Sequence, residues 1–241
     1  MATNRTRFSI QLKDAVTGAS IISAGGKVIV CQAGTPDKAT LFSDADGTSL
    51  ANPLTPTRGF IEFWTLDTLA SVDLYIMSPT GHFLSHSGVV ASGLNEIAVA
   101  TNERQGTMKI PFSIADTTAT TETNTGIAIP ATGAIQPSPL LLVTAIDATE
   151  TIDVGTLSTD GGDADGFLVT ASVAALGLVK GSLANGATTL GALLFVVDSA
   201  NAGDEAPEQN VSMAGKTITY TLTAGSDTAK GFIILPYHLA A

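Results

Sequence analysis

The sequence contains a single cysteine and lacks any long apolar run. One cysteine, Cys31, excludes an internal disulfide, which suits assembly in a reducing cytoplasm and argues against a secreted disulfide scaffold. Because Cys31 lies in the strand-like run at residues 27–31, next to Val28, Ile29 and Val30, we expect it to be a small core residue. No basic-then-apolar signal opens the chain, and no uninterrupted apolar run approaches the roughly 20 residues that a membrane helix needs. We therefore expect no membrane partner.

Positive charge is scarce as well. The chain has 11 Lys+Arg against 22 Asp+Glu, a formal net charge of -11. Such a field repels nucleic acid and anionic lipid, so we expect no nucleic-acid partner. The excess is uneven, since residues 104–241 hold five Lys+Arg against thirteen Asp+Glu and residues 1–103 hold six against nine. An acidic second half suits a basic neighbour, although solubility alone also explains it.

Aromatic residues are few, at 5% of the chain, with one tryptophan, Trp64. Sandwich domains that bind carbohydrate present aromatic platforms, so this scarcity argues against carbohydrate binding. Phe60, Glu62 and Trp64 alternate with Ile61 and Phe63, which leaves the tryptophan on either face of a strand. We expect Trp64 to lie in the core, because large aromatic side chains are generally buried.

What the chain does have is a high apolar content arranged in short runs. Hydrophobic residues make up 44% and charged residues 14%, which is typical of a globular protein. The runs alternate or are rich in β-branched residues, and Gly, Pro, Asp, Asn, Ser and Thr separate them, as in sandwiches and barrels. The expected strands are 8–12, 27–31, 40–42, 60–64, 72–77, 96–101, 108–113, 140–146, 152–154, 193–197, 217–222 and 231–235.

Two segments depart from simple alternation. Residues 140–143 and 193–197 are apolar on both faces, which predicts central strands or strands beneath a second surface such as a neighbouring subunit. Residues 167–183 have a helical spacing of apolar side chains, but Gly177 interrupts it. We expect a short helix or an irregular loop there.

A polar cluster with a glycine at residues 102–106 marks the best domain boundary. We predict an all-β fold of two antiparallel β-sandwich-like domains, residues 1–103 and residues 104–241, joined by a short linker. A polar stretch at residues 116–124 and three prolines between residues 130 and 139 predict a proline-bearing extended arm near residues 116–139. Such an arm suits contact with a neighbour, and the candidate partner-binding residues are Pro130, Ile135, Pro137, Pro139 and Leu140.

The alternating aspartates at residues 160–166 resemble the start of a calcium loop. The register fails, because Gly161 and Ser172 fall where a calcium loop requires carboxylates. A glycine-rich acidic turn is the expected structure, with a cation near Asp160 to Asp165 left open. The sequence from Asp44 to Gly47 likewise predicts a tight hairpin turn.

Other reactive groups lack partners in the sequence. His82 and His86 are four residues apart, but no third ligand for a metal is identifiable. There is no Gly-x-Ser-x-Gly elbow, and Cys31 has no evident base beside it. Neither glycine-rich nucleotide-binding motif occurs. We expect no catalytic residue, no metal and no cofactor.

A resemblance rests on residues 40–64. This segment has a strand ending in an aromatic residue, an Asp-x-x-Gly turn, an Ala-Asn-Pro triplet, and a glycine followed by an aromatic strand. The residues in these places are Phe42, Asp44, Gly47, Ala51, Asn52, Pro53, Gly59, Phe60, Phe63 and Trp64. The order resembles a small β-sandwich module of tailed-bacteriophage particle proteins, and the likeness continues to about residue 101. Residues 153–168 and 219–232 are similar to phage structural proteins encoded near head genes.

The resemblance implies a non-enzymatic structural protein of a bacteriophage virion. We expect a capsid decoration, or cement, protein that binds the outer surface of the major capsid protein and stabilises the head. It would be assembled in the host cytoplasm as a homo-oligomer, for which a trimer is one form. A tail fibre, baseplate or receptor-binding component is the alternative. A virion-borne glycan hydrolase is a third hypothesis, although no motif supplies its carboxylate pair.

Overall fold

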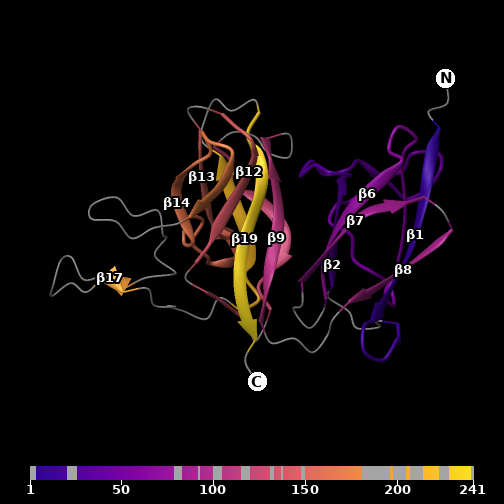
Figure 1. The fold of residues 1–241 in the computed structure, drawn as a ribbon, viewed down its shortest axis with the longest axis horizontal. Helices are drawn as coiled ribbons and strands as arrows, with labels where there is room; N and C mark the ends of the chain where they lie inside the picture. Colours follow the sequence, from indigo (N-terminus) through magenta and orange to yellow (C-terminus); the bar gives the residue numbers. More distant parts are fainter. Residues whose placement is uncertain are drawn as a thin grey trace. The chain divides into compact units, whose positions relative to one another are not determined.

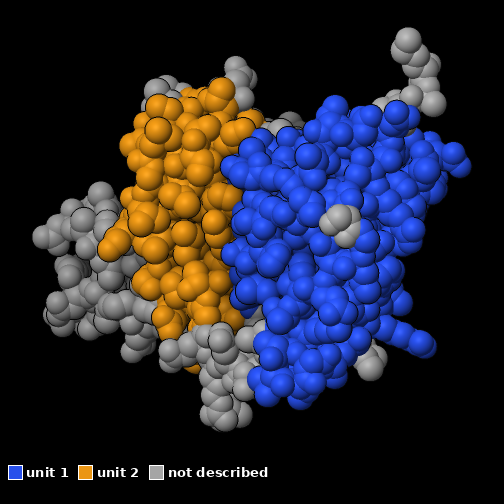
Figure 2. Space-filling model, turned by 45° about the vertical axis from the view of Figure 1, so that its right-hand side comes forward, with its two compact units in different colours: residues 1–103 blue, residues 104–241 orange. Residues whose placement is uncertain are grey.

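The computed structural model divides the chain into two compact units, residues 1–103 and residues 104–241, coloured blue and orange in Figure 2. The division falls at the polar cluster where the sequence places its domain boundary. The structure describes residues 4–20, 26–78, 83–91, 93–99, 105–114, 120–130, 133–136, 138–147, 150–180, 196–197, 205–206, 214–222 and 228–239. The predicted all-β fold is confirmed, since the elements are strands apart from short 3-10 turns. No helix in these residues has the length and apolar character needed to span a membrane.

Unit 1 consists of two sheets (Figure 1). Sheet A has the strand order β4-β3-β5-β1-β8, and sheet B has the order β2-β6-β7. Neighbouring strands are antiparallel except β1 and β8, which are parallel. The bounds are β1 Arg5–Asp14, β2 Lys27–Gln32, β3 Leu41–Phe42, β4 Ser49–Leu50, β5 Phe60–Leu66, β6 Ser71–Met77, β7 Phe83–Val90 and β8 Leu94–Val99.

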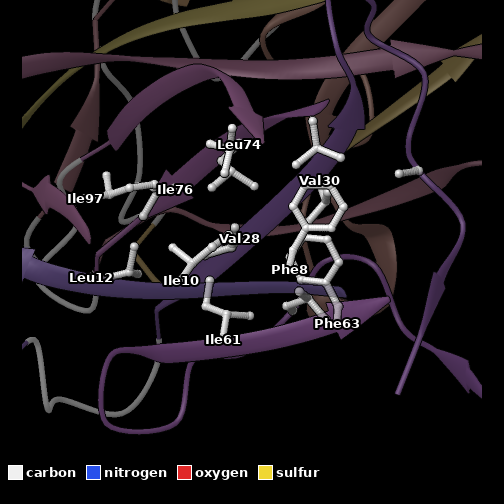
Figure 3. Close-up of a cluster of buried hydrophobic side chains, with 14 of the residues drawn as sticks. Phe8, Ile10, Leu12, Val28, Val30, Ile61, Phe63, Leu74, Ile76 and Ile97 are labelled. Carbon is white, nitrogen blue, oxygen red and sulfur yellow. The ribbon is translucent and has the colours of Figure 1, made fainter. Parts of the chain in front are cut away.

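The core of unit 1 lies between these sheets. Every second side chain of β1 and β5 points inward, where it meets side chains of β2 and β6 (Figure 3). The rings of Phe8 and Phe63 stack with centroids 5.2 Å apart and an interplanar angle of 7°. Both rings are fully buried. Cys31 is fully buried too, which confirms its expected place inside the protein.

The predicted turn after Phe42 is a hairpin that joins β3 to β4. One carboxylate oxygen of Asp44 accepts hydrogen bonds from the backbone N–H groups of Gly47 at 2.8 Å and Thr48 at 3.0 Å. Gly47 has a φ of 100°, which favours glycine at this position. The residue types that predicted the turn therefore also explain its geometry.

We expect the Asp44 carboxyl to titrate with a pKa of about 2, below its ordinary value of 3.8. The Thr48 hydroxyl contributes most to the lowering, followed by the Thr48 N–H group. Because the folded-state pKa is depressed, the turn is stabilised above pH 3.8 and loses this contribution as the pH falls through about 2. An NMR titration of the side-chain carboxyl tests this, and Thr48→Val should raise the midpoint. A midpoint at the ordinary value in the unaltered chain would contradict it.

Unit 2 is a second sandwich. Sheet C has the order β11-β19-β12-β15, with β9 paired to β19, and sheet D has the order β10-β18-β13-β14; β16 and β17 form a separate pair. The bounds are β9 Gln105–Ser113, β10 Thr123–Ala128, β11 Gly133–Ile135, β12 Leu140–Ala145, β13 Thr151–Thr156, β14 Leu168–Ser172, β15 Gly177–Lys180, β16 Val196–Val197, β17 Glu205–Ala206, β18 Thr217–Leu222 and β19 Lys230–Leu239. A short 3-10 helix, η2, spans Ser158–Asp160.

Buried aromatic side chains join sheets C and D. Phe112 on β9 meets Tyr220 on β18 edge to face, with centroids 6.1 Å apart. The Tyr220 hydroxyl donates to the backbone oxygen of Ser113 at 3.3 Å. This hydrogen bond satisfies the polar end of a ring that is fully buried.

The expectation of a short helix or loop at residues 167–183 is wrong. The described part of this segment, residues 167–180, contains β14 and β15, which residues 173–176 join. The apolar side chains of this segment do not share one buried face. Val173 and Leu168 are buried in the sandwich, while Leu176 is 68% exposed. Gly177, with a φ of 106°, redirects the chain into β15.

Candidate functional site

The outward face of sheet A gathers aromatic and arginine side chains on an open surface. We call it the aromatic–arginine face and define it by Arg5, Arg7, Phe42, Phe60, Glu62, Trp64, Leu66 and Leu94. Phe60 and Leu66 are each 36% exposed, and Leu94 is 56% exposed. Exposed large apolar side chains grouped with arginine are typical of a binding surface.

The expected core position of Trp64 is wrong. Ile61 and Phe63 are the inward residues of β5, at 4% and 0% exposure, so Trp64 points outward and is half-buried. Strand register then places Trp64 between Arg7 of β1 and Phe42 of β3. The side chains of β5 alternate between its two faces, as the sequence predicts. Both faces carry apolar residues, however, so the sequence does not determine which face is inside.

Both arginines lie over aromatic rings. The guanidinium carbon of Arg5 is 4.5 Å from the centroid of the Phe42 ring, and that of Arg7 is 5.5 Å from Trp64. These cation–π contacts hold the long arginine side chains flat against the sheet. Less conformational entropy is then lost when a partner covers them.

The turn after Phe42 is part of this arrangement. Arg5 donates a hydrogen bond from Nη1 to the backbone oxygen of Ala45 at 2.8 Å. A Cβ added to Gly47 would lie 2.1 Å from Nη2 of Arg5, so a side chain here would require the guanidinium to move. The Asp-x-x-Gly turn singled out in the sequence therefore shapes one end of the face.

Two ion pairs lie on the outward side of sheet A. Arg7 forms an ion pair with Glu62, with the Arg7 Nε–H also donating to Glu62 Oε2 at 3.0 Å. Farther along β1, Lys13 pairs with Glu96 at 2.6 Å. Because these pairs are largely exposed, each contributes little to stability. The main effect of the Arg7–Glu62 pair is to orient the Arg7 guanidinium beside Trp64.

Two open hollows adjoin Phe60. One, of about 500 Å³, is lined by Arg7, Ser9, Phe60, Gly93 and Leu94. The other, of about 370 Å³, includes Pro53 and Thr57 in its lining. Phe60 contributes to both hollows, so a partner residue can contact its ring from either side.

The predicted partner-binding residues lie on a different part of the fold. Ile135 is fully buried and is opposite Tyr237 in sheet C, and Pro139 is also buried. Pro130 and Leu140 are half-buried, and Pro137 lies outside the described residues. The side chains of Ile135 and Pro139 are therefore packed inside the fold, whereas those of Pro130 and Leu140 are partly exposed. A partner contact at these residues stays a prediction.

The described part of the proline-bearing arm expected near residues 116–139 contains strands and is not an extended arm. Residues 123–128 and 133–135 are β10 and β11, which pair with β18 and β19. Ile127 and Ile129 are buried at alternate positions, a strand signal that the nearby prolines obscured. Pro130 follows β10 and Pro139 precedes β12, where no ladder hydrogen bond is required of them.

The acidic segment at residues 158–166 forms a turn. It begins with η2 and reverses at Gly161, which has a φ of 68°. A hydrogen bond with Asp165, followed by burial, raises the pKa of Asp163. Burial is the main cause that raises the pKa of Asp153, and the Asp165 charge adds to it.

Metal ligands are not grouped in the part of the chain that the structure describes. No set of three or more His, Cys, Asp or Glu side chains there is placed to hold a metal ion. His86 is exposed on β7, and His82 lies outside the described residues. The pairing of these two histidines is therefore not described.

Comparisons with known proteins give no family. No protein-family model matches the chain, and no curated protein matches it. Two crystal structures of the major pilin subunit BcpA of Bacillus cereus, one of them a variant, are similar at 11% identity, with TM-scores of 0.23 and 0.22. Each match covers 98% of this chain and 59% of the pilin chain, so this chain spans less than two thirds of the pilin's length.

Proposed function

We propose that the chain is a non-enzymatic structural protein of a bacteriophage particle. Its role is that of a capsid decoration protein, which binds the outer surface of the major capsid protein and stabilises the head. The aromatic–arginine face carries this proposal. Tryptophan and arginine are the side chains that most often dominate binding energy at protein interfaces.

The segment with the phage-like sequence pattern also builds this face. Phe42, Phe60 and Trp64 are outward members of the face, while Asp44 and Gly47 form the turn that accommodates Arg5. Burying the exposed apolar part of the face stabilises a complex by about 25 cal/mol per Å². Many copies on one shell multiply a modest contribution.

Counting copies in purified particles tests the role. A decoration protein is present in hundreds of copies, and a cryo-electron microscopy map would place its density on the capsid surface. A count of about a dozen or fewer, or density confined to the tail, would contradict the proposal.

A tail fibre, baseplate or receptor-binding component is the second candidate. It is favoured by the outward position of Trp64 and Phe60, because flat exposed aromatic rings also stack on sugars. Glycan-array binding that is lost in Trp64→Ala would support this candidate, particularly together with a low copy number. The two measurements separate the candidates, since a decoration protein needs no glycan.

A further inference from the structure

The outward face of sheet C in unit 2 combines leucine with lysine, and of its apolar side chains Leu178 is exposed whereas Phe232 is buried. Leu142 on β12 lies between Leu178 of β15 and Phe232 of β19 in the sheet register. In the next row, Leu140 lies between Lys180 and Ile234. Leu178 is 62% exposed, and Lys180 is exposed as well. We call this set the leucine–lysine face.

All the formal charge on this face is positive. Lys109 lies opposite Ile234, with its Nζ 4.2 Å from the centroid of the Phe232 ring, and Lys230 lies on the same side of β19. No Asp or Glu occupies an outward position among the described side chains of β9, β12, β15 and β19. This is unusual for a unit with thirteen Asp+Glu and five Lys+Arg.

Around sheet D negative charge exceeds positive charge, although Lys216 donates a hydrogen bond to the backbone oxygen of Gly161 in the acidic turn. Asp153 points outward from β13, where it accepts a hydrogen bond from the Thr170 N–H at 2.6 Å. Asp160, Asp163 and Asp165 follow in the turn after β13, and Asp160 and Asp165 are exposed. We call these four carboxylates the acidic group. Burial is the main cause of the raised pKa of Asp153, and a hydrogen bond with Asp165 is the main cause for Asp163; the Asp165 charge adds to both.

We infer that the leucine–lysine face of one copy binds the acidic group of a second copy. Such a contact buries the exposed Leu178 and brings lysine ammonium groups to the carboxylates of the acidic group. Pairing the leucine–lysine face with itself would oppose lysine to lysine, so charge complementarity favours a head-to-tail contact. Head-to-tail contacts between identical chains close into rings or extend as filaments. The contact does not depend on the proposed attachment to a capsid.

The test is sedimentation velocity of the full chain over a range of concentrations, at about 0.05 M and about 0.5 M salt. We expect concentration-dependent association that weakens at high salt. Lys180→Glu and Asp160→Lys should each reduce the association constant by about tenfold or more. The double variant, which again opposes unlike charges, should recover most of the loss. Leu178→Ser should weaken association at both salt concentrations because it removes apolar area.

The control is Lys38→Glu, which makes the same change in net charge in unit 1 and should leave association unchanged. Lys180, Leu178 and Asp160 are exposed, so the substitutions should not alter the thermal unfolding midpoint. A monomeric chain at every concentration overturns the inference, as does a double variant that associates no better than the single ones. Trp64→Ala should associate normally, which separates this contact from the proposed capsid attachment.

Discussion

Phe63→Ala is expected to lower the free energy of unfolding of unit 1 by about 3–5 kcal/mol. Phe63 is fully buried and stacks on Phe8, so truncation removes a ring from the centre of the core and leaves a cavity between sheets A and B. Single domains are typically stable by about 5–15 kcal/mol, so the loss is a large fraction of the total.

The experiment uses an optical reporter that the chain already contains. Trp64 is the only tryptophan, so its fluorescence during urea unfolding reports on unit 1. Leu66→Ala is the matched control, because it truncates an outward and partly exposed residue of the same strand. We expect it to cost no more than about 1 kcal/mol. Similar effects of the two substitutions would mean that the inward and outward faces of β5 are assigned wrongly.

Much of the fold follows from local sequence patterns. The alternation at residues 8–12 predicts a half-buried strand, and β1 buries Phe8, Ile10 and Leu12 while Ser9 and Gln11 between them are only partly buried. The residues from Asp44 to Gly47 predict the β3–β4 hairpin because their backbone preferences are local. Local preference does not depend on the rest of the chain, which is why these features are readable.

The predictions that are wrong concern residues whose position depends on neighbours far away in the sequence. β5 has apolar residues on both sides, and packing against sheet B decides which side is inward. The prediction that Trp64 lies in the core is wrong for this reason. The aromatic–arginine face was missed for a related reason. Arg7, Phe42 and Trp64 are far apart in the sequence and become neighbours only through the register of β1, β3 and β5. The sequence shows three isolated residues, whereas the sheet makes them one surface.

For the proposed role as a capsid decoration protein, Trp64→Ala is expected to weaken binding of the chain to phage heads that lack it by about 30-fold or more. This corresponds to about 2 kcal/mol, the usual threshold for a dominant interface residue. Truncation removes the aromatic surface and also releases Arg7, whose guanidinium lies over the Trp64 ring. Co-sedimentation of purified chain with heads over a concentration series measures the effect.

Two further variants show which property of Trp64 matters. Trp64→Phe keeps a flat aromatic ring under Arg7 and should retain most of the affinity, whereas Arg7→Ala should lose affinity through a different group on the same surface. Circular dichroism would establish that each variant keeps the unfolding midpoint of the unaltered chain, as expected for outward residues. If folded Trp64→Ala binds heads as tightly as the unaltered chain, attachment occurs through another surface. If neither protein binds heads but only the unaltered chain binds glycans, the same face serves receptor recognition.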